Sequence, residues 1–171
     1  MTGGAGEDEA VEVSSPACAM HEASDAYMGY AGREELVAAL NELLEAERAG
    51  ARVTLETAAA TADTRIAALM HAIQKDESRW CAMLSRHLKE LGAVPSPQVG
   101  ACQARAMAIA DLGERIEFLN CGQGWVVRKL RELLPRVRGD RLHADLKEML
   151  GSHEANIALA RDAREGRPSA P

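Results

Sequence analysis

The chain has 171 residues, a formal net charge of −6 and only 3% aromatic residues, against 47% hydrophobic residues. This length is typical of one domain, and a core with so few rings must be built from aliphatic side chains, which favours packed helices over a sandwich or a barrel. No apolar run reaches the roughly 18 residues of a membrane span, and no basic patch indicates nucleic-acid binding.

The N-terminus and the cysteines indicate the compartment. The first residues lack the basic start and the apolar stretch of a signal peptide. The 4 cysteines lie far apart and form no Cys-x-x-Cys pair. This spacing predicts reduced thiols in a cytoplasmic protein, not a disulfide or zinc framework.

Both ends of the chain are expected to be disordered. Residues 1–32 carry six acidic residues, no Lys or Arg and no hydrophobic periodicity, so the net charge belongs to this tail. Cys18 and His21 form a Cys-x-x-His pair there, which we interpret as a chance pair in a tail. Residues 164–171 are expected to form a second disordered tail, which leaves residues 33–163 for the folded domain.

Four long segments between the tails show the apolar period of a helix, over residues 34–60, 64–91, 112–134 and 141–162. Asp63 and Asp111 are typical N-caps, and Gly92 and Pro135 are typical helix ends. The first and last connections are short, which predicts two antiparallel hairpins. Residues 92–111 form a long crossover, expected to be extended at first and then to contain a short helix. The fold class is therefore an all-α, antiparallel four-helix bundle.

Each apolar stripe is interrupted near its middle by one polar residue: Glu47, Glu77, Gln123 and His153. Helices of similar length that pack side by side would bring these four into one layer. Burying such groups costs several kcal/mol unless they pair, form hydrogen bonds or hold a metal. We therefore expect the function of the protein to lie in this layer.

The segments around these residues resemble the ferritin-like superfamily, and specifically an uncharacterised branch of small bacterial ferritin-like proteins. The resemblance rests on residues 43–51 (LLEAERAGA), 76–81 (DESRWC), 122–130 (GQGWVVRKL) and 152–157 (SHEANI), and it covers about residues 34–160. It implies a ferritin-like bundle with a long crossover between its hairpins. For this superfamily the expected di-iron ligands are a Glu on the first and third helices and a Glu-x-x-His motif on the second and fourth.

This sequence departs from that ligand pattern. Glu47 and Glu77 match in type, whereas other residues stand at the remaining ligand positions: Trp80, Gln123, His153 and Asn156. A standard di-iron centre is therefore not expected. One Fe, Mn or Zn ion would have Glu47, Glu77 and His153 as ligands. Gln123 and Asn156 would be weaker ligands or hydrogen-bond partners of the ligands, and Trp80 would form a wall of the site.

Two functional hypotheses remain open at this stage. The first is a metal-binding or redox protein with this smaller, non-standard ligand set in the bundle centre. The sequence leaves open whether such a protein is an enzyme. The second is a metal-free bundle, held by a hydrogen-bond network, that acts as a binding or regulatory module, with a homodimer or another protein partner. A pocket that reaches the polar layer would favour the first, and a large apolar patch on an outer helix face would favour the second. Outside the layer, we expect His87 to be a partly exposed residue at a helix end, and Cys81 and Cys121 to be core thiols.

Overall fold

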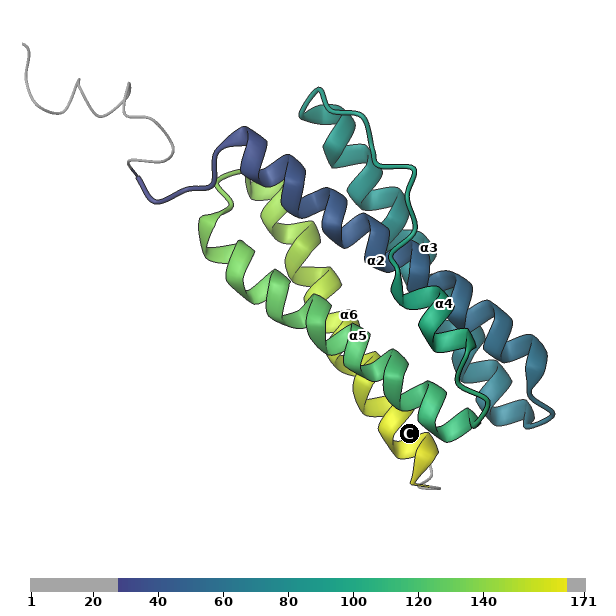
Figure 1. Ribbon diagram of the computed structural model, residues 1–171. Coiled ribbons are helices and arrows are strands. Elements are labelled where there is room, and N and C mark those ends of the chain that lie inside the picture. The colour runs from purple at the N-terminus through teal and green to yellow at the C-terminus, as the bar shows by residue number, and fades with distance from the viewer. Residues whose placement is uncertain (1–27, 166–171) are drawn as a thin grey trace, which may run out of the picture.

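The computed structural model describes residues 28–165, and every regular element in this part of the chain is a helix (Figure 1). The elements are α2 (Arg33–Ala60), α3 (Thr64–Glu90), α4 (Cys102–Met107), α5 (Leu112–Leu133), the short 3-10 helix η2 (Leu134–Arg136) and α6 (Asp140–Arg164). The long helices begin and end within two residues of the predicted positions. The predicted four-helix bundle is confirmed.

The helices form two hairpins, as the connection lengths predict. Helix α2 packs chiefly on α3, and α5 packs chiefly on α6. The segment 91–101 crosses from one hairpin to the other, and α4 then lies against both α2 and α5 (Figure 1). The expected extended stretch followed by a short helix is therefore present in the crossover.

Capping residues explain where two of the long helices begin. The Asp63 carboxylate accepts hydrogen bonds from the backbone N–H groups of Arg65 and Ile66, at 2.8 and 3.2 Å. The Asp111 carboxylate accepts one from the N–H of Glu114 at 2.8 Å. These bonds satisfy amide groups that have no partner within the helix. Gly92, with φ of 68°, follows the last turn of α3 in the left-handed conformation that favours glycine.

The core consists of two apolar clusters, one on each side of the predicted polar layer. One cluster includes Leu40, Leu43, Leu84, Leu130 and Met149. The other includes Val53, Met70, Ile73, Ile116 and Ala160. On every long helix the polar residue lies between the positions that enter the two clusters. The fold thus holds the polar layer in the middle of the bundle, with apolar packing above and below it.

Side chains of α2 fasten the crossover to the bundle. The Asn41 amide oxygen accepts a hydrogen bond from the backbone N–H of Ser96 at 2.7 Å, and the Glu45 carboxylate accepts one from the Ser96 hydroxyl. Arg48 donates to the carbonyl of Ser96. The Gly100 N–H donates to the Glu45 carbonyl at 2.9 Å. These contacts place α4 over the space between α2 and α5.

The predicted tails lie mostly outside the described residues, namely over 1–27 and 166–171, and Cys18 and His21 lie there as well. Residues 28–32, which the sequence assigned to the tail, are described. Ala31 is buried, and its N–H donates to the Arg136 carbonyl at 2.9 Å, because a small side chain fits against the α5–α6 turn. Within the described part of the chain, no helix combines the length and the apolar composition needed to cross a membrane.

Candidate functional site

The polar layer predicted from the sequence is present and buried. Glu47 comes from α2, Glu77 from α3, Gln123 from α5 and His153 from α6, and each side chain is at most 4% exposed. Each residue occupies a position of its helix that faces the bundle axis, because the apolar residues one turn away on either side face the same way. The bundle therefore brings together one polar group from each of its long helices.

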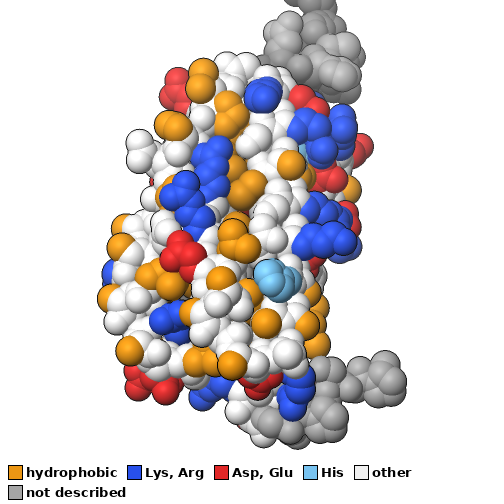
Figure 2. All heavy atoms as spheres, turned by 90° about the vertical axis from the view of Figure 1, so that its right-hand side faces the viewer, with side chains coloured by type: hydrophobic (Ala, Val, Ile, Leu, Met, Phe, Trp, Pro, Cys, Tyr) orange, Lys and Arg blue, Asp and Glu red, His pale blue; other side chains and the backbone are white. Residues whose placement is uncertain are grey.

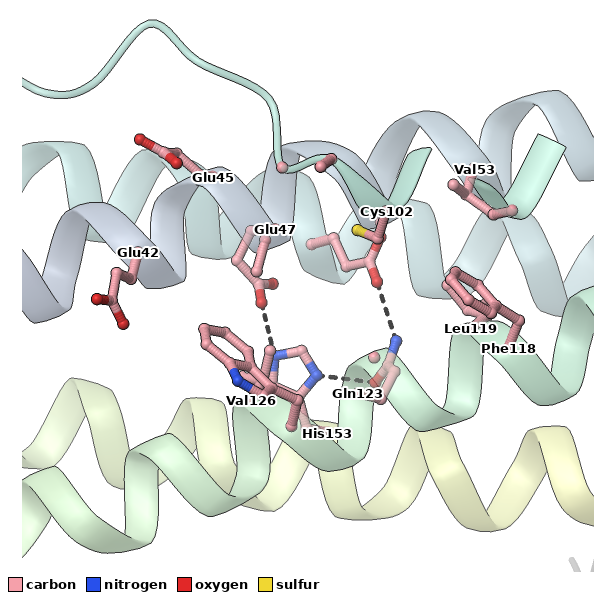
Figure 3. Close-up of a pocket in the computed structure, with 18 residues that line it drawn as sticks. Glu42, Glu45, Glu47, Val53, Cys102, Phe118, Leu119, Gln123, Val126 and His153 are labelled. Atoms are coloured by element: carbon pink, nitrogen blue, oxygen red, sulfur yellow. Dashed lines mark hydrogen bonds and ion pairs between the residues drawn. The ribbon is translucent and has the colours of Figure 1, made fainter. Parts of the chain in front are cut away.

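The four side chains form one continuous chain of contacts. The Gln123 amide donates from Nε2 to Glu77 Oε1 at 2.9 Å, and its Oε1 accepts from Nδ1 of His153 at 2.8 Å. The other ring nitrogen, Nε2, lies 3.1 Å from Glu47 Oε1. Figure 3 shows Gln123 and His153 joined in this way, with Glu47 facing the opposite side of the ring.

This chain of contacts fixes where one proton of the imidazole lies. An amide oxygen only accepts, so Nδ1 of His153 must donate to Gln123. The other ring nitrogen, Nε2, lies 3.1 Å from Glu47 Oε1, a separation at which a proton or another cation near the two atoms is favourable.

Several buried atoms of the layer have no hydrogen-bond partner. They include Oε2 of Glu47, Oε2 of Glu77 and Nε2 of His153, which is close enough to Glu47 for an ion pair but is not aligned for a hydrogen bond. Burial raises the pKa of Glu77 well above its ordinary value, and the charge of Glu47 raises it further. The hydrogen bond from Gln123 and the nearby Thr54 hydroxyl lower the Glu77 pKa, but by less than burial and charge raise it. The layer thus contains several buried polar atoms without a hydrogen-bond partner.

Gly50 makes the space that the Glu77 carboxyl group occupies. A Cβ atom on Gly50 would lie 2.4 Å from Glu77 Oε1 and 2.6 Å from both Cδ and Oε2. No real Cβ tolerates such contacts, so the carboxyl group packs directly on the backbone of α2. Gly122 and Gly151 have no such neighbour within 4 Å. The close approach of α2 and α3 therefore depends on glycine at position 50.

Two other predicted site residues take no part in the chain of contacts, and neither lines the cavity described below. Trp80 is 2% exposed in the first apolar cluster, and its indole nitrogen has no hydrogen-bond partner. The Asn156 amide donates to Asp76 at 3.2 Å, together with the Ser152 hydroxyl at 3.1 Å. Asp76 and Ser152 were not among the sequence candidates, and the only signal for Asp76 was its place next to Glu77.

The donor groups of the layer fit one metal ion in kind but do not fit a di-iron centre. Among residues 28–165, no group of three or more His, Cys, Asp or Glu side chains lies close enough to hold a metal. Gln123 stands between Glu77 and His153 and binds both. Glu47 and His153 are adjacent, and Glu77 offers one unpartnered oxygen in the same layer. The three predicted ligands share a layer, but the structure does not gather them into one coordination sphere.

A cavity of about 340 Å³ opens onto the layer from the side of α4. Its floor includes all four polar residues of the layer, and its walls are mostly apolar (Figure 3). The wall residues labelled in Figure 3 include Val53, Phe118, Leu119 and Val126. The pocket that would favour a metal or ligand site over an interaction module is therefore present.

The surface gives less support to an interaction module. The large exposed hydrophobic side chains of the described residues are Met28, Leu55, Val94 and Leu159, which lie in different segments. On the face in Figure 2, hydrophobic side chains occur in small groups between charged ones. A continuous apolar patch of the kind that marks a docking surface is not seen on that face.

Two expectations outside the layer were wrong. His87 is 4% exposed, not partly exposed, because α6 supplies a partner: its Nε2 lies 2.6 Å from Asp145 Oδ2, and its Nδ1 lies 3.0 Å from Glu90 Oε2. Cys121 is exposed rather than a core thiol, since it lies on the outer face of α5. Cys81 is half-buried, and burial, together with the charge of Glu47, raises the pKa of its thiol to about 12.

Comparisons with known proteins agree with the fold. Comparison with curated proteins finds no match. Among solved structures, the chain is similar to a protein described as a ferritin-like, diiron-carboxylate protein from Bacillus anthracis str. Ames. The TM-score is 0.58 at 18% identity, and the match covers 78% of this chain and 93% of the other. A family model described as a domain of unknown function, DUF6306, matches residues 34–163. The chain has a ferritin-like fold and belongs to the DUF6306 family.

Proposed function

We propose that this protein binds one divalent transition-metal ion in the polar layer, with Glu47, Glu77 and His153 as its ligands. The observation that carries the proposal is that these three side chains each hold a buried atom without a hydrogen-bond partner, at the floor of one cavity. A cation beside Glu47 and His153 would satisfy their two atoms, and a movement of the Glu77 carboxyl group would complete the set. The diiron-carboxylate description of the structural neighbour supports the general class of site.

The contacts of His153 support this proposal further. Metal-binding histidines commonly donate their second ring N–H to an oxygen, which fixes the tautomer and turns the other nitrogen toward the ion. Gln123 accepts from Nδ1 in this manner, and Nε2 is left beside Glu47. An imidazole with two carboxylates suits Fe, Mn or Zn. Such an ion supplies Lewis-acid chemistry and, for Fe or Mn, redox chemistry.

A second candidate is a metal-free layer, and one observation favours it. Hydrogen bonds already join Glu77 to Gln123 and Gln123 to His153, and a proton on Nε2 of His153 would add an ion pair with Glu47. In that state the cavity serves to bind a small molecule, and the polar layer serves as its floor. The two candidates differ in whether a metal or a proton occupies the position between Nε2 and Glu47.

Metal titration of the full-length chain distinguishes them. Protein stripped with a chelator would be titrated with Fe²⁺, Mn²⁺, Zn²⁺ and Co²⁺, and bound metal would be measured by plasma mass spectrometry. The visible spectrum of the Co²⁺ form reports the number and type of ligands. The His153→Gln variant removes the proposed nitrogen ligand. The matched control is His87→Gln, which replaces another buried histidine. His87 lies ten residues after Glu77 on α3, which is about 15 Å along the helix axis.

One ion per chain in the wild type and in His87→Gln, but not in His153→Gln, would support the metal site. A folded wild type that binds no metal would refute it and leave the metal-free layer. Metal that His153→Gln retains unchanged would also refute it, because the ion would then lie elsewhere.

A further inference from the structure

The cavity above the polar layer has an unusual charge pattern. Four carboxylates line it, from Glu42, Glu45, Glu47 and Glu77, and its lining contains no Lys or Arg. Lys129 binds Glu42 from outside the lining at 2.7 Å. The Glu45 carboxylate accepts a hydrogen bond from the Ser96 hydroxyl, which is neutral. An acidic lining without Lys or Arg favours a cation over an anion in the cavity.

The floor of the cavity contains hydrogen-bond acceptors that lack a donor partner. Glu47 and Glu77 are 1% and 3% exposed, and an oxygen of each lacks a hydrogen-bond partner. Both residues line the cavity, and their unpartnered oxygens lie just beneath its surface, so a small movement of either side chain would bring them to a donor inside it. A group with several N–H donors and a positive charge would satisfy both oxygens, whereas a hydroxyl has one donor and a carboxylate has none.

The walls of the cavity suit a ligand with an apolar part. The apolar residues that line it include Val53, Phe118, Leu119, Trp125 and Val126. A volume of about 340 Å³ lies at the lower end of the range for small-molecule sites and is enough for a chain or ring of several carbons. The rings of Phe118 and Trp125 add apolar surface to these walls.

We propose that this cavity binds a small primary amine with an apolar body, its ammonium group directed at Glu47 and Glu77. The apolar part then lies against the walls between α2, α4 and α5. This inference goes beyond the proposed metal site, since it concerns an organic ligand and holds for protein that contains no metal. An alkylammonium group keeps its charge at neutral pH, as a lysine side chain does.

Calorimetric titration of the chelator-treated full chain tests the proposal. The ligands are n-butylamine, n-hexylamine and n-octylamine, with n-hexanol and hexanoate as head-group controls. We expect affinity to rise about threefold to fourfold per methylene until the chain fills the cavity. Hexanol is expected to bind at least tenfold more weakly than hexylamine, and hexanoate not measurably.

Variants separate cavity binding from adsorption to an acidic surface. Glu47→Gln removes one floor carboxylate and is expected to weaken hexylamine at least tenfold. Ala46→Phe fills the cavity from α2 and is expected to abolish binding, with circular dichroism as the check on folding. The matched control is Glu148→Gln, which removes an exposed carboxylate of α6, and it should bind as the wild type does.

The outcomes keep this inference apart from the metal proposal. Equal affinities for hexylamine and hexanoate, or hexylamine binding that Ala46→Phe leaves unchanged in a folded variant, would overturn the inference. No amine binding in a protein that takes up one metal ion would overturn it and leave the metal site intact. Amine binding in a protein that takes up no metal would overturn only the metal site.

Discussion

Gly50→Ala is the substitution that tests the packing of the site most directly. The new Cβ would lie 2.4 Å from Glu77 Oε1 and 2.6 Å from Cδ and Oε2, so the whole carboxyl group has to move. Gly50 has no positive φ, so alanine fits its backbone conformation without strain. The effect of the substitution therefore comes from the displaced carboxyl group.

The magnitude follows from three opposing contributions. Alanine gains about 1 kcal/mol over glycine inside a helix. Moving Glu77 breaks its hydrogen bond with Gln123 in a buried setting, which costs about 1–3 kcal/mol. A strained rotamer adds about 0.5–1.5 kcal/mol. We expect Gly50→Ala to lower the free energy of unfolding by roughly 1–3 kcal/mol.

Gly151→Ala on α6 is the matched control, since its Cβ meets no atom within 4 Å. It should raise the free energy of unfolding by about 0.5–1 kcal/mol. Urea unfolding followed by circular dichroism measures both variants. A Gly50→Ala protein as stable as Gly151→Ala would refute the reasoning. In a Glu77→Ala background the obstacle is gone, and Gly50→Ala should then become stabilising.

Three further predictions follow from single contacts. Burial alone would raise the pKa of Asp145, but the hydrogen bond and charge of His87, with Arg86, lower it. Asp145→Asn should therefore lower the free energy of unfolding by about 1 kcal/mol near pH 7. This difference from the wild type should disappear as the pH falls below 3.8, and urea unfolding at several pH values measures it. Alkylation followed by peptide mapping should modify Cys121 at least tenfold faster than Cys81, whose thiol is protonated at neutral pH. Gln123→Leu leaves two buried polar partners unpaired and should cost about 2–5 kcal/mol in the same unfolding assay.

The sequence was sufficient to predict the bundle and its polar layer. Apolar period, N-caps and connection lengths set the helices within two residues, because these signals are local. The layer was predictable because each polar residue interrupts an otherwise apolar stripe, and the fold buries all four. The residues that lie between the two apolar clusters are thus the ones that the pattern singled out.

The partners within the layer were not predictable in the same way. The sequence suggested Gln123 and Asn156 as equal helpers of a metal, but only Gln123 joins the chain of contacts, while Asn156 turns to Asp76. Side-chain direction depends on the rotation of each helix about its axis, which the apolar period fixes only coarsely. His87 was misplaced for a related reason, because its burial depends on Asp145 of a helix distant in sequence.

The unpartnered atoms of the layer link stability to binding. A buried polar atom without a partner costs about 1–3 kcal/mol, in a protein whose total stability is of the order of 5–15 kcal/mol. A ligand that satisfies Glu47 and Glu77 must therefore stabilise the fold, by about 2.7 kcal/mol at a concentration of 100 times its Kd. A thermal-unfolding screen of divalent metals and alkylamines would thus rank both classes of cation on one scale. Stabilisation by either class should fall in Glu47→Gln, for an alkylamine to about half of the wild-type value or less at the same concentration, since that substitution removes a charge that both classes need.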